Sequence, residues 1–452
     1  MQPHHKIVVT FFSPSGYEVV KGNRVADWVF YLPLDTRRNA TRFLDAVQPV
    51  KVIFVKYEFW YNFLRALKRR NIPTYVVSAT FHPAQPFFKW YGAIFRRMLR
   101  MFTLLFVQNQ ASAALLAQIG VTNVVVAGDS RFDRVRCQAQ RPCTLPIVEA
   151  FCGANDATPS KEVVCVAGST WPTDEALLFQ ALKALQGDSR ESLQCVSGES
   201  LSSDSSKSLP SDSGESLSSD SSKSLQCVSG ESLSSDSSKS LPNESPKANG
   251  RFKLILVPHE VDSAHIESIM KQFAPFSPVR YSELSEAVKS LDGAEKSLDG
   301  ALRSLNDPDK SLNDSRVLVI DTIGLLSSLY RFGSFAFVGG GFEHGIHNTL
   351  EAAVYGIPVI FGPKYEKFNE AVDLIRLGGA HAIHSRQEVV AQIESWLSSP
   401  EMCAKEGRVC AEYVEGHIGA TDIVLHAIVS GDTAIVSGNI AIIQGNNAIV
   451  RK

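Results

Sequence analysis

Short apolar runs alternate with amphipathic stretches of helical length along most of this chain. In the first part, the runs predicted as strands are Lys6–Phe12, Val52–Val55, Thr74–Ser78, Leu104–Gln108 and Val124–Ala127. The stretches predicted as helices between them are 39–47, 59–70, 87–101 and 111–119. Apolar strands that alternate with helices favour a parallel sheet, because each crossover helix covers one of its faces.

A second series of the same kind follows, with predicted strands at 162–167, 253–257, 316–320, 335–338 and 358–361. We therefore expect an α/β fold class with two doubly wound domains in succession. The expected bounds are 1–150 for an N-terminal domain and 161–422 for a C-terminal domain.

Three segments of biased composition interrupt this plan. Residues 197–241 contain 22 serines in 45 positions, so we expect 187–250 to be a disordered insertion in a surface loop. Residues 286–315 carry a seven-residue repeat, in which one leucine per heptad and repeated Gly, Asn and Pro argue against the alternative of a coiled coil. Residues 423–452 form a repetitive tail.

Charge is distributed unevenly along the chain. Residues 1–136 hold 19 Lys and Arg against 7 Asp and Glu, a net charge of +12. This asymmetry suggests an anionic partner for the first part, either phosphate groups or a membrane surface, and the alternative is a solvated basic face. The eight cysteines form no CxxC pair, which favours a reducing compartment, and no run of 18 apolar residues predicts a membrane span.

The segment from Phe335 to Pro363 has the clearest ligand-binding pattern. A predicted strand runs into Gly339, Gly340 and Gly341, which would let a ligand approach the main chain closely. Backbone amides near His347, Asn348 and Thr349, at the start of a predicted helix, would face an anion with the helix dipole behind them. Glu351, in the first turn, could accept hydrogen bonds from ribose hydroxyls. The dinucleotide pattern GxGxxG is absent.

The combination of Gly-Gly-Gly, His-Asn-Thr-Leu-Glu-Ala-Ala and Gly-Ile-Pro-Val-Ile-Phe-Gly-Pro resembles the 3-deoxy-D-manno-octulosonic acid (Kdo) transferases. Further motifs agree in order: they are Tyr31–Asp35, Tyr57–Trp60, Val107–Asn109, Gly128–Asp133 and Ala167–Thr170. The resemblance implies a GT-B fold, in which two Rossmann-like domains face each other across a cleft. It also implies transfer of Kdo from CMP-Kdo to a lipid A precursor in lipopolysaccharide biosynthesis, by an inverting displacement without a metal ion or other cofactor.

The resemblance also assigns partners and site residues. The partners are CMP-Kdo, the lipid A precursor and the cytoplasmic face of the inner membrane, with no nucleic acid. Glu58 would organise the acceptor, the alternative being a helix-capping carboxylate. Arg131 would act on a phosphate, the alternative being an ion pair with Asp129 or Asp133. The remaining donor contacts would come from Gly168, Ser169, Thr170 and His259, for which helix capping and structural polar packing are the alternatives.

One departure from the family concerns the general base. In the family, an anchor and a first βα unit precede the equivalent of Lys6 and carry a Gly-Glu whose carboxylate acts as the base. The match begins after that point, so we expect a truncated start or an impaired gene product. The rival interpretations are a donor-binding remnant and another nucleotide-sugar enzyme. Glu343, His344 and His347 lack a fourth ligand, so no metal site is expected.

The stretch 87–102 is aromatic, aliphatic and basic, with no acidic residue. This segregation is typical of a helix that lies in a bilayer interface with its cations towards lipid phosphates. The alternative is a helix packed on the sheet, with arginine side chains reaching into solvent.

Overall fold

The computed structural model describes residues 6–22, 26–153, 162–185, 252–290 and 312–430. The expected insertion at 187–250 lies outside the described residues. So does most of the repeat at 286–315, whose ends alone are described. Of the expected tail, only 423–430 is described, and these residues belong to a helix.

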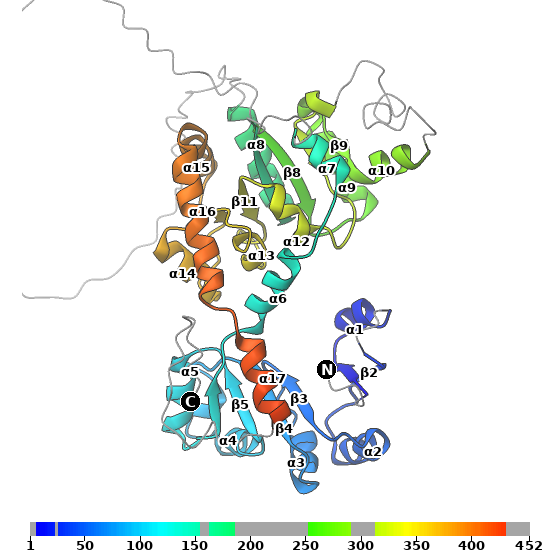
Figure 1. The fold of residues 1–452 in the computed structure, drawn as a ribbon, viewed down its shortest axis with the longest axis vertical. Helices are drawn as coiled ribbons and strands as arrows, with labels where there is room; N and C mark the ends of the chain where they lie inside the picture. The colour runs from blue at the N-terminus through cyan, green and yellow to red at the C-terminus, as the bar shows by residue number, and fades with distance from the viewer. Residues whose placement is uncertain (1–5, 23–25, 154–161, 186–251, 291–311, 431–452) are drawn as a thin grey trace, which may run out of the picture.

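The described strands form three parallel sheets (Figure 1). A two-stranded sheet pairs β1 (Val8–Phe11) with β2 (Trp28–Tyr31). A four-stranded sheet has the order β3 (Val52–Val55), β4 (Thr74–Ala79), β5 (Leu104–Val107) and β6 (Val124–Val126). A seven-stranded sheet has the order β13 (Ala380–Ala382), β12 (Val359–Phe361), β11 (Phe335–Val338), β7 (Val163–Thr170), β8 (Phe252–Pro258), β10 (Val317–Val319) and β9 (Val279–Arg280). The expected α/β class with parallel sheets is confirmed.

Helices accompany the first two sheets. They are α1 (Pro14–Val20), α2 (Arg37–Val47), α3 (Tyr61–Arg69), α4 (Ala93–Leu99) and α5 (Gln110–Gln118), with a 3₁₀ turn at Pro86–Phe88. The prediction of one helix over 87–101 is wrong, because the chain bends at Gly92. A Cβ atom at Gly92 would lie 2.1 Å from the carbonyl oxygen of Pro86, so only glycine allows this approach.

The remaining helices are α6 (Ser130–Ala139), α7 (Pro146–Phe151), α8 (Pro172–Leu185), α9 (Ser263–Gln272), α10 (Tyr281–Ser290), α12 (Leu326–Leu329), α13 (Leu350–Ala353), α14 (Asn369–Leu377), α15 (Arg386–Ser398), α16 (Pro400–Glu415) and α17 (Ala420–Ser430). Short 3₁₀ turns occupy Ala274–Phe276, Leu312–Asp314 and Tyr330–Phe332. Within the described residues, no helix is both long enough and apolar enough to cross a membrane.

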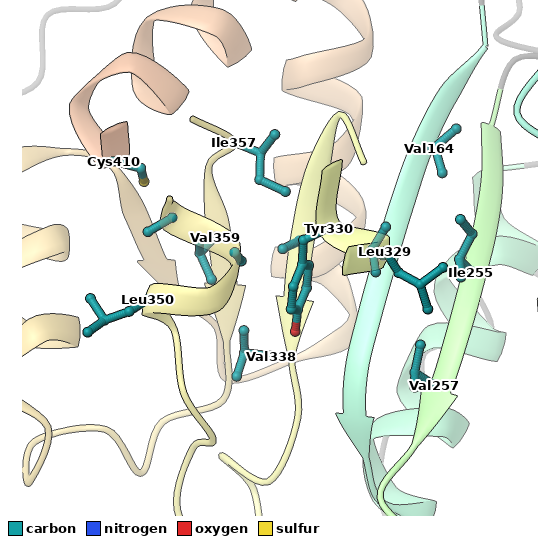
Figure 2. Packing of buried hydrophobic residues seen from close by; sticks show 14 of the residues in the cluster. Val164, Ile255, Val257, Leu329, Tyr330, Val338, Leu350, Ile357, Val359 and Cys410 are labelled. Carbon is teal, nitrogen blue, oxygen red and sulfur yellow. The ribbon is translucent and has the colours of Figure 1, made fainter. Parts of the chain in front are cut away.

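The seven-stranded sheet is buried on both faces, as its continuous apolar strands predict. Val164 and Val166 of β7 belong to one hydrophobic cluster, whereas Cys165 and Ala167 belong to a second cluster on the opposite face. Figure 2 shows the first cluster, in which Tyr330 packs among aliphatic side chains of the sheet and its helices. Because both faces are covered, the strands are held in place, and their carboxyl ends line one edge of the sheet.

Helices α6 and α17 connect the two larger sheets (Figure 1). The Asp133 carboxylate on α6 accepts hydrogen bonds from the amides of Gly419 and Thr421, at 2.6 and 2.7 Å, and so caps the start of α17. Ala427 and Ile428 of α17 then pack against the four-stranded sheet. Residues 146–152 pack with the core of the seven-stranded sheet, although they lie in the range expected for the first domain.

Candidate functional site

Three neighbouring strands of the seven-stranded sheet end at one place. In the register of the parallel sheet, Val338 of β11 lies beside Gly168 of β7, and Gly168 lies beside Val257 of β8. The segments that follow these strands therefore meet at the carboxyl edge of the sheet, where parallel α/β sheets bind ligands. The expected donor residues lie at this edge: Gly168–Thr170 are the last residues of β7, whereas His259 and Gly339–Gly341 directly follow β8 and β11.

The glycines at this edge are required by main-chain packing. A Cβ atom at Gly339 would lie 2.3 Å from the carbonyl oxygen of Ser169, and one at Gly341 would lie 2.6 Å from the amide nitrogen of Gly362. Gly340 has a φ of +89°, which L-residues rarely adopt. The space beside all three is thus filled by the chain itself, and the expected close approach of a ligand stays a prediction.

Gly168 has a different neighbour. A Cβ atom there would lie 2.2 Å from the hydroxyl oxygen of Tyr330, whose side chain is 1% exposed. Burial raises the pKa of Tyr330 well above its usual range, so the hydroxyl stays protonated. Ser169 follows with a φ of +54°, a conformation that is strained for a residue with a side chain. The carboxyl end of β7, where the register with β8 is irregular, is therefore fixed by its contact with Tyr330.

Asp174 joins two of the strand ends. Its Oδ2 atom accepts hydrogen bonds from the amides of Gly340, at 2.8 Å, and Trp171, at 2.9 Å. The side chain is almost fully buried, and this burial raises its pKa although the two amides oppose the shift. The sequence analysis did not identify Asp174, because its contact with Gly340 depends on a strand order that the sequence does not reveal.

Aromatic and imidazole rings gather on the same edge. Trp171 stacks on His259 with ring centroids 4.8 Å apart, and His259 lies 4.6 Å from His347. The indole Nε1 of Trp171 donates a hydrogen bond to Nε2 of His347 at 3.3 Å. Burial, and then the neighbouring His259, lower the pKa of His347, so that this imidazole is neutral near pH 7. The expected residues His259 and His347 are thus brought together by a tryptophan that sequence reasoning missed.

The segment around Glu351 departs from the expected helix start. Helix α13 has only four residues, so its dipole is too small for the expected stabilisation of an anion near His347–Thr349. Thr349 is fully buried, and its hydroxyl has no hydrogen-bond partner among the described residues. Asn348 instead donates from Nδ2 to Oε1 of Glu351 at 3.0 Å, and Arg134 of α6 approaches the same carboxylate at 3.6 Å.

Arg131 is held by two carboxylates rather than free. Its Nε atom donates to Asp129 at 2.8 Å, and its two terminal nitrogens donate to the Glu370 carboxylate at 2.8 and 3.3 Å. Burial lowers the pKa of Arg131, but the Glu370 and Asp129 carboxylates outweigh this effect and raise it overall. The ion pair with Asp129 was an expected alternative. The alternative pair with Asp133 is wrong, because Asp133 caps α17.

Glu58 lies apart from these groups. It follows β3, is exposed, and accepts a hydrogen bond from Nε1 of Trp60 at 2.5 Å. The structure does not show it capping α3: the amides of Asn62 and Phe63 are bonded by Asp35 instead, each at 3.1 Å. Within the described part of the chain, no hydrogen bond joins Glu58 to the seven-stranded sheet.

One group of described residues has the spacing of metal ligands. The ligand atoms of Glu260, Asp262 and His265 lie within 4.8 Å of one another. Asp262 already caps α9, and His265 is bonded to the buried Glu175 at 2.9 Å. Both are therefore committed to structural contacts, and the group gives no reason to infer a metal ion.

Comparisons with known proteins agree with the sequence motifs. Residues 1–134 match a family model described as 3-deoxy-D-manno-octulosonic-acid transferase. The transferase of that name from Aquifex aeolicus is 21% identical over 402 residues, which cover 88% of this chain and 80% of the relative. That from Haemophilus influenzae is 23% identical over 433 residues, which cover 94% and 79%.

Among solved structures, the UDP-GlcNAc 2-epimerase from Neisseria meningitidis bound to UDP-GlcNAc is similar, with a TM-score of 0.52 and 14% identity. The match covers 94% of this chain and 91% of that one. At this identity the likeness shows the fold alone. Together with the parallel sheets, it confirms the expected GT-B-like α/β class.

Proposed function

We propose that this chain is a distant member of the Kdo transferase family and that it transfers Kdo from CMP-Kdo to a lipid A precursor at the cytoplasmic face of the inner membrane. The observation that carries this proposal is the joining of three strand ends by Asp174 and by the rings of Trp171, His259 and His347. Such an edge offers hydrogen-bond donors and flat rings to a nucleotide.

The donor residues divide by chemistry. The turn at Ser169 and Thr170 would face the CMP phosphate or the Kdo carboxylate, and His259 would contact the donor beside it. Glu351 is 18% exposed and would accept hydrogen bonds from ribose hydroxyls, with Asn348 orienting its carboxylate. The neutral His347 would donate or accept a hydrogen bond without adding a charge.

In the transfer, the bond from the anomeric carbon to the CMP phosphate oxygen breaks, and CMP leaves with the electron pair. The acceptor hydroxyl forms the new bond to that carbon and loses its proton to solvent water, because no described residue is assigned as the general base. Glu58, an exposed carboxylate at the carboxyl end of β3, would organise the acceptor hydroxyl. Arg131, already bound by Asp129 and Glu370, fits a positioning role between α6 and α14 better than direct contact with phosphate.

The bend at Gly92 supplies a membrane contact. Trp90, Tyr91 and Ile94 are 91%, 55% and 52% exposed, whereas Phe87 and Leu99 are buried. Exposed aromatic side chains next to the exposed Arg97 suit the interface of a bilayer with anionic lipids. Residues 87–102 thus combine both alternatives of the sequence analysis. The buried Phe87 and Leu99 pack in the core, whereas the exposed side chains around Gly92 would contact lipid.

Calorimetry on the full chain tests the donor assignment. CMP should bind more tightly than UDP. The Glu351→Gln variant should bind CMP about 10-fold or more weakly, because a hydrogen bond to a charged group contributes about 1.5–3 kcal/mol. Glu394→Gln, on the exposed face of α15, is the matched control and should bind as the parent does. Tighter binding of UDP would favour another nucleotide-sugar enzyme and contradict the proposal.

A further inference from the structure

A basic groove lies between α2 and α3, on the helices of the four-stranded sheet. The cavity has a volume of about 220 Å³, and its polar lining consists of Arg37, Thr41, Asn62, Arg65, Arg69 and Arg70. In Figure 1 these two helices lie in the lower half of the molecule, whereas the strands of the candidate donor site lie in the upper half. The groove is therefore separate from the donor site.

Most of the positive charge in the groove is not neutralised by the protein. Arg70 is paired with Asp45, at 2.7 Å. The guanidinium groups of Arg37, Arg65 and Arg69 form neither a hydrogen bond nor an ion pair with the residues that the structure describes. Asp35, the other nearby carboxylate, is occupied by the amides of Asn62 and Phe63. Three guanidinium groups thus face one small cavity without a counter-charge.

The position of Arg37 opposes local helix stability. Arg37 and Arg38 occupy the first turn of α2, which contains no acidic residue. Cations are unfavourable at a helix N-terminus, because the dipole there is positive. Neither ion pairing nor helix capping accounts for these arginines, whereas a bound anion would.

We propose that this groove binds the phosphate group of an anionic lipid headgroup. Guanidinium groups match phosphate oxygens in geometry and stay charged at any physiological pH. The neighbouring surface favours a lipid as the source of the phosphate. Helix α3 packs against α2 on one side and α4 on the other, and the exposed Trp90, Tyr91 and Ile94 lie at the start of α4. The basic groove and these three exposed apolar side chains therefore belong to helices that pack against each other.

Vesicle binding of the full chain tests this proposal without donor or acceptor, so its outcome is independent of the proposed transfer reaction. Binding to vesicles of phosphatidylcholine alone is compared with binding to vesicles that also contain phosphatidic acid. The double variant Arg65→Gln/Arg69→Gln should lose affinity for the anionic vesicles by about 30-fold, since each basic side chain near such a surface contributes about a factor of five.

The matched control is Arg386→Gln/Arg408→Gln, which removes the same charge from exposed positions on α15 and α16. It should bind within about twofold of the parent. An equal loss in both variants would overturn the groove as the site, because only net charge would matter. A third arm adds inorganic phosphate. Suppose that inorganic phosphate raises the Tm of the parent but not of the Arg65→Gln/Arg69→Gln variant, while both bind vesicles equally. The groove would then bind free phosphate rather than a lipid headgroup, and the proposal would be overturned.

Discussion

Replacement of Gly339 by alanine isolates the packing role of the glycine-rich turn. A Cβ atom at this position would lie 2.3 Å from the carbonyl oxygen of Ser169 and 2.7 Å from Cα of Thr170. Both neighbours are main-chain atoms of the last two residues of β7, which cannot rotate away as a long side chain can. The carbonyl would have to retreat to at least 3.4 Å, the start of ordinary contact. The end of β7, which carries the expected donor contacts, would move with this carbonyl.

We expect Gly339→Ala to lower the free energy of unfolding of the ligand-free protein by about 1–3 kcal/mol, the range for overpacking of a dense core. For a domain of about 200 residues, this corresponds to a fall in Tm of roughly 2–12 °C. Differential scanning calorimetry measures the shift. Gly22→Ala is the control, because Gly22 is exposed and its Cβ would meet nothing within 4 Å. CMP affinity should fall in the first variant and not in the second.

The reasoning has a clear refutation. If the sequence places glycine at 339 only to admit a ligand, alanine would weaken CMP binding but leave the Tm of the ligand-free protein unchanged. A Tm equal to that of Gly22→Ala would therefore show that the contact between the ends of β7 and β11 is not the constraint.

Three further predictions concern individual ionisable side chains. Lys253→Met should lower the free energy of unfolding by about 1–3 kcal/mol in urea titrations, because it leaves the buried carbonyl of Phe151 without its 2.7 Å donor; an unchanged free energy would contradict this. Burial lowers the pKa of His347 in the folded chain. As the pH falls through about 6.5, this imidazole is therefore protonated more readily in the unfolded chain, and the free energy of unfolding decreases. His347→Gln should flatten this loss between about pH 7.5 and 5.5, and an unchanged slope would refute it. A thiol reagent should label the exposed Cys137 in the native protein but not Cys410, whose pKa burial raises to about 12; mass spectrometry of the peptides would show equal labelling if this is wrong.

Apolar periodicity was sufficient to predict most strands of the two larger sheets, because buried parallel strands are continuous apolar runs. It did not identify β9, which has two residues, or β13, whose sequence Ala-His-Ala is not an apolar run. It also missed β2, although Trp28–Tyr31 is a continuous apolar run. It also failed at Gly92, where the composition of 87–101 suits a helix but a close approach to Pro86 ends it.

The site was predictable as a set of residues but not as an arrangement. Glycines and histidines could be named from motifs, whereas the contacts of Asp174 with Gly340 and of Trp171 with His259 require that β7, β8 and β11 be neighbours. The same limit applies to Arg131. An ion pair two residues away could be foreseen, but its bond to Glu370 spans 239 positions of the sequence. This pair depends on how α6 packs against α14, which local sequence pattern does not determine.

The most direct test of the account is the reaction itself. The purified full chain is incubated with CMP-Kdo and a lipid A precursor in detergent micelles, and the lipid is analysed by mass spectrometry. The account predicts a lipid that has gained Kdo, with CMP released in equal amount, at a rate about 10²–10⁴-fold below that of a transferase with a general base, because no described residue is assigned that role. An unchanged lipid, under conditions in which the Aquifex aeolicus transferase modifies the same sample, would contradict the proposed transfer.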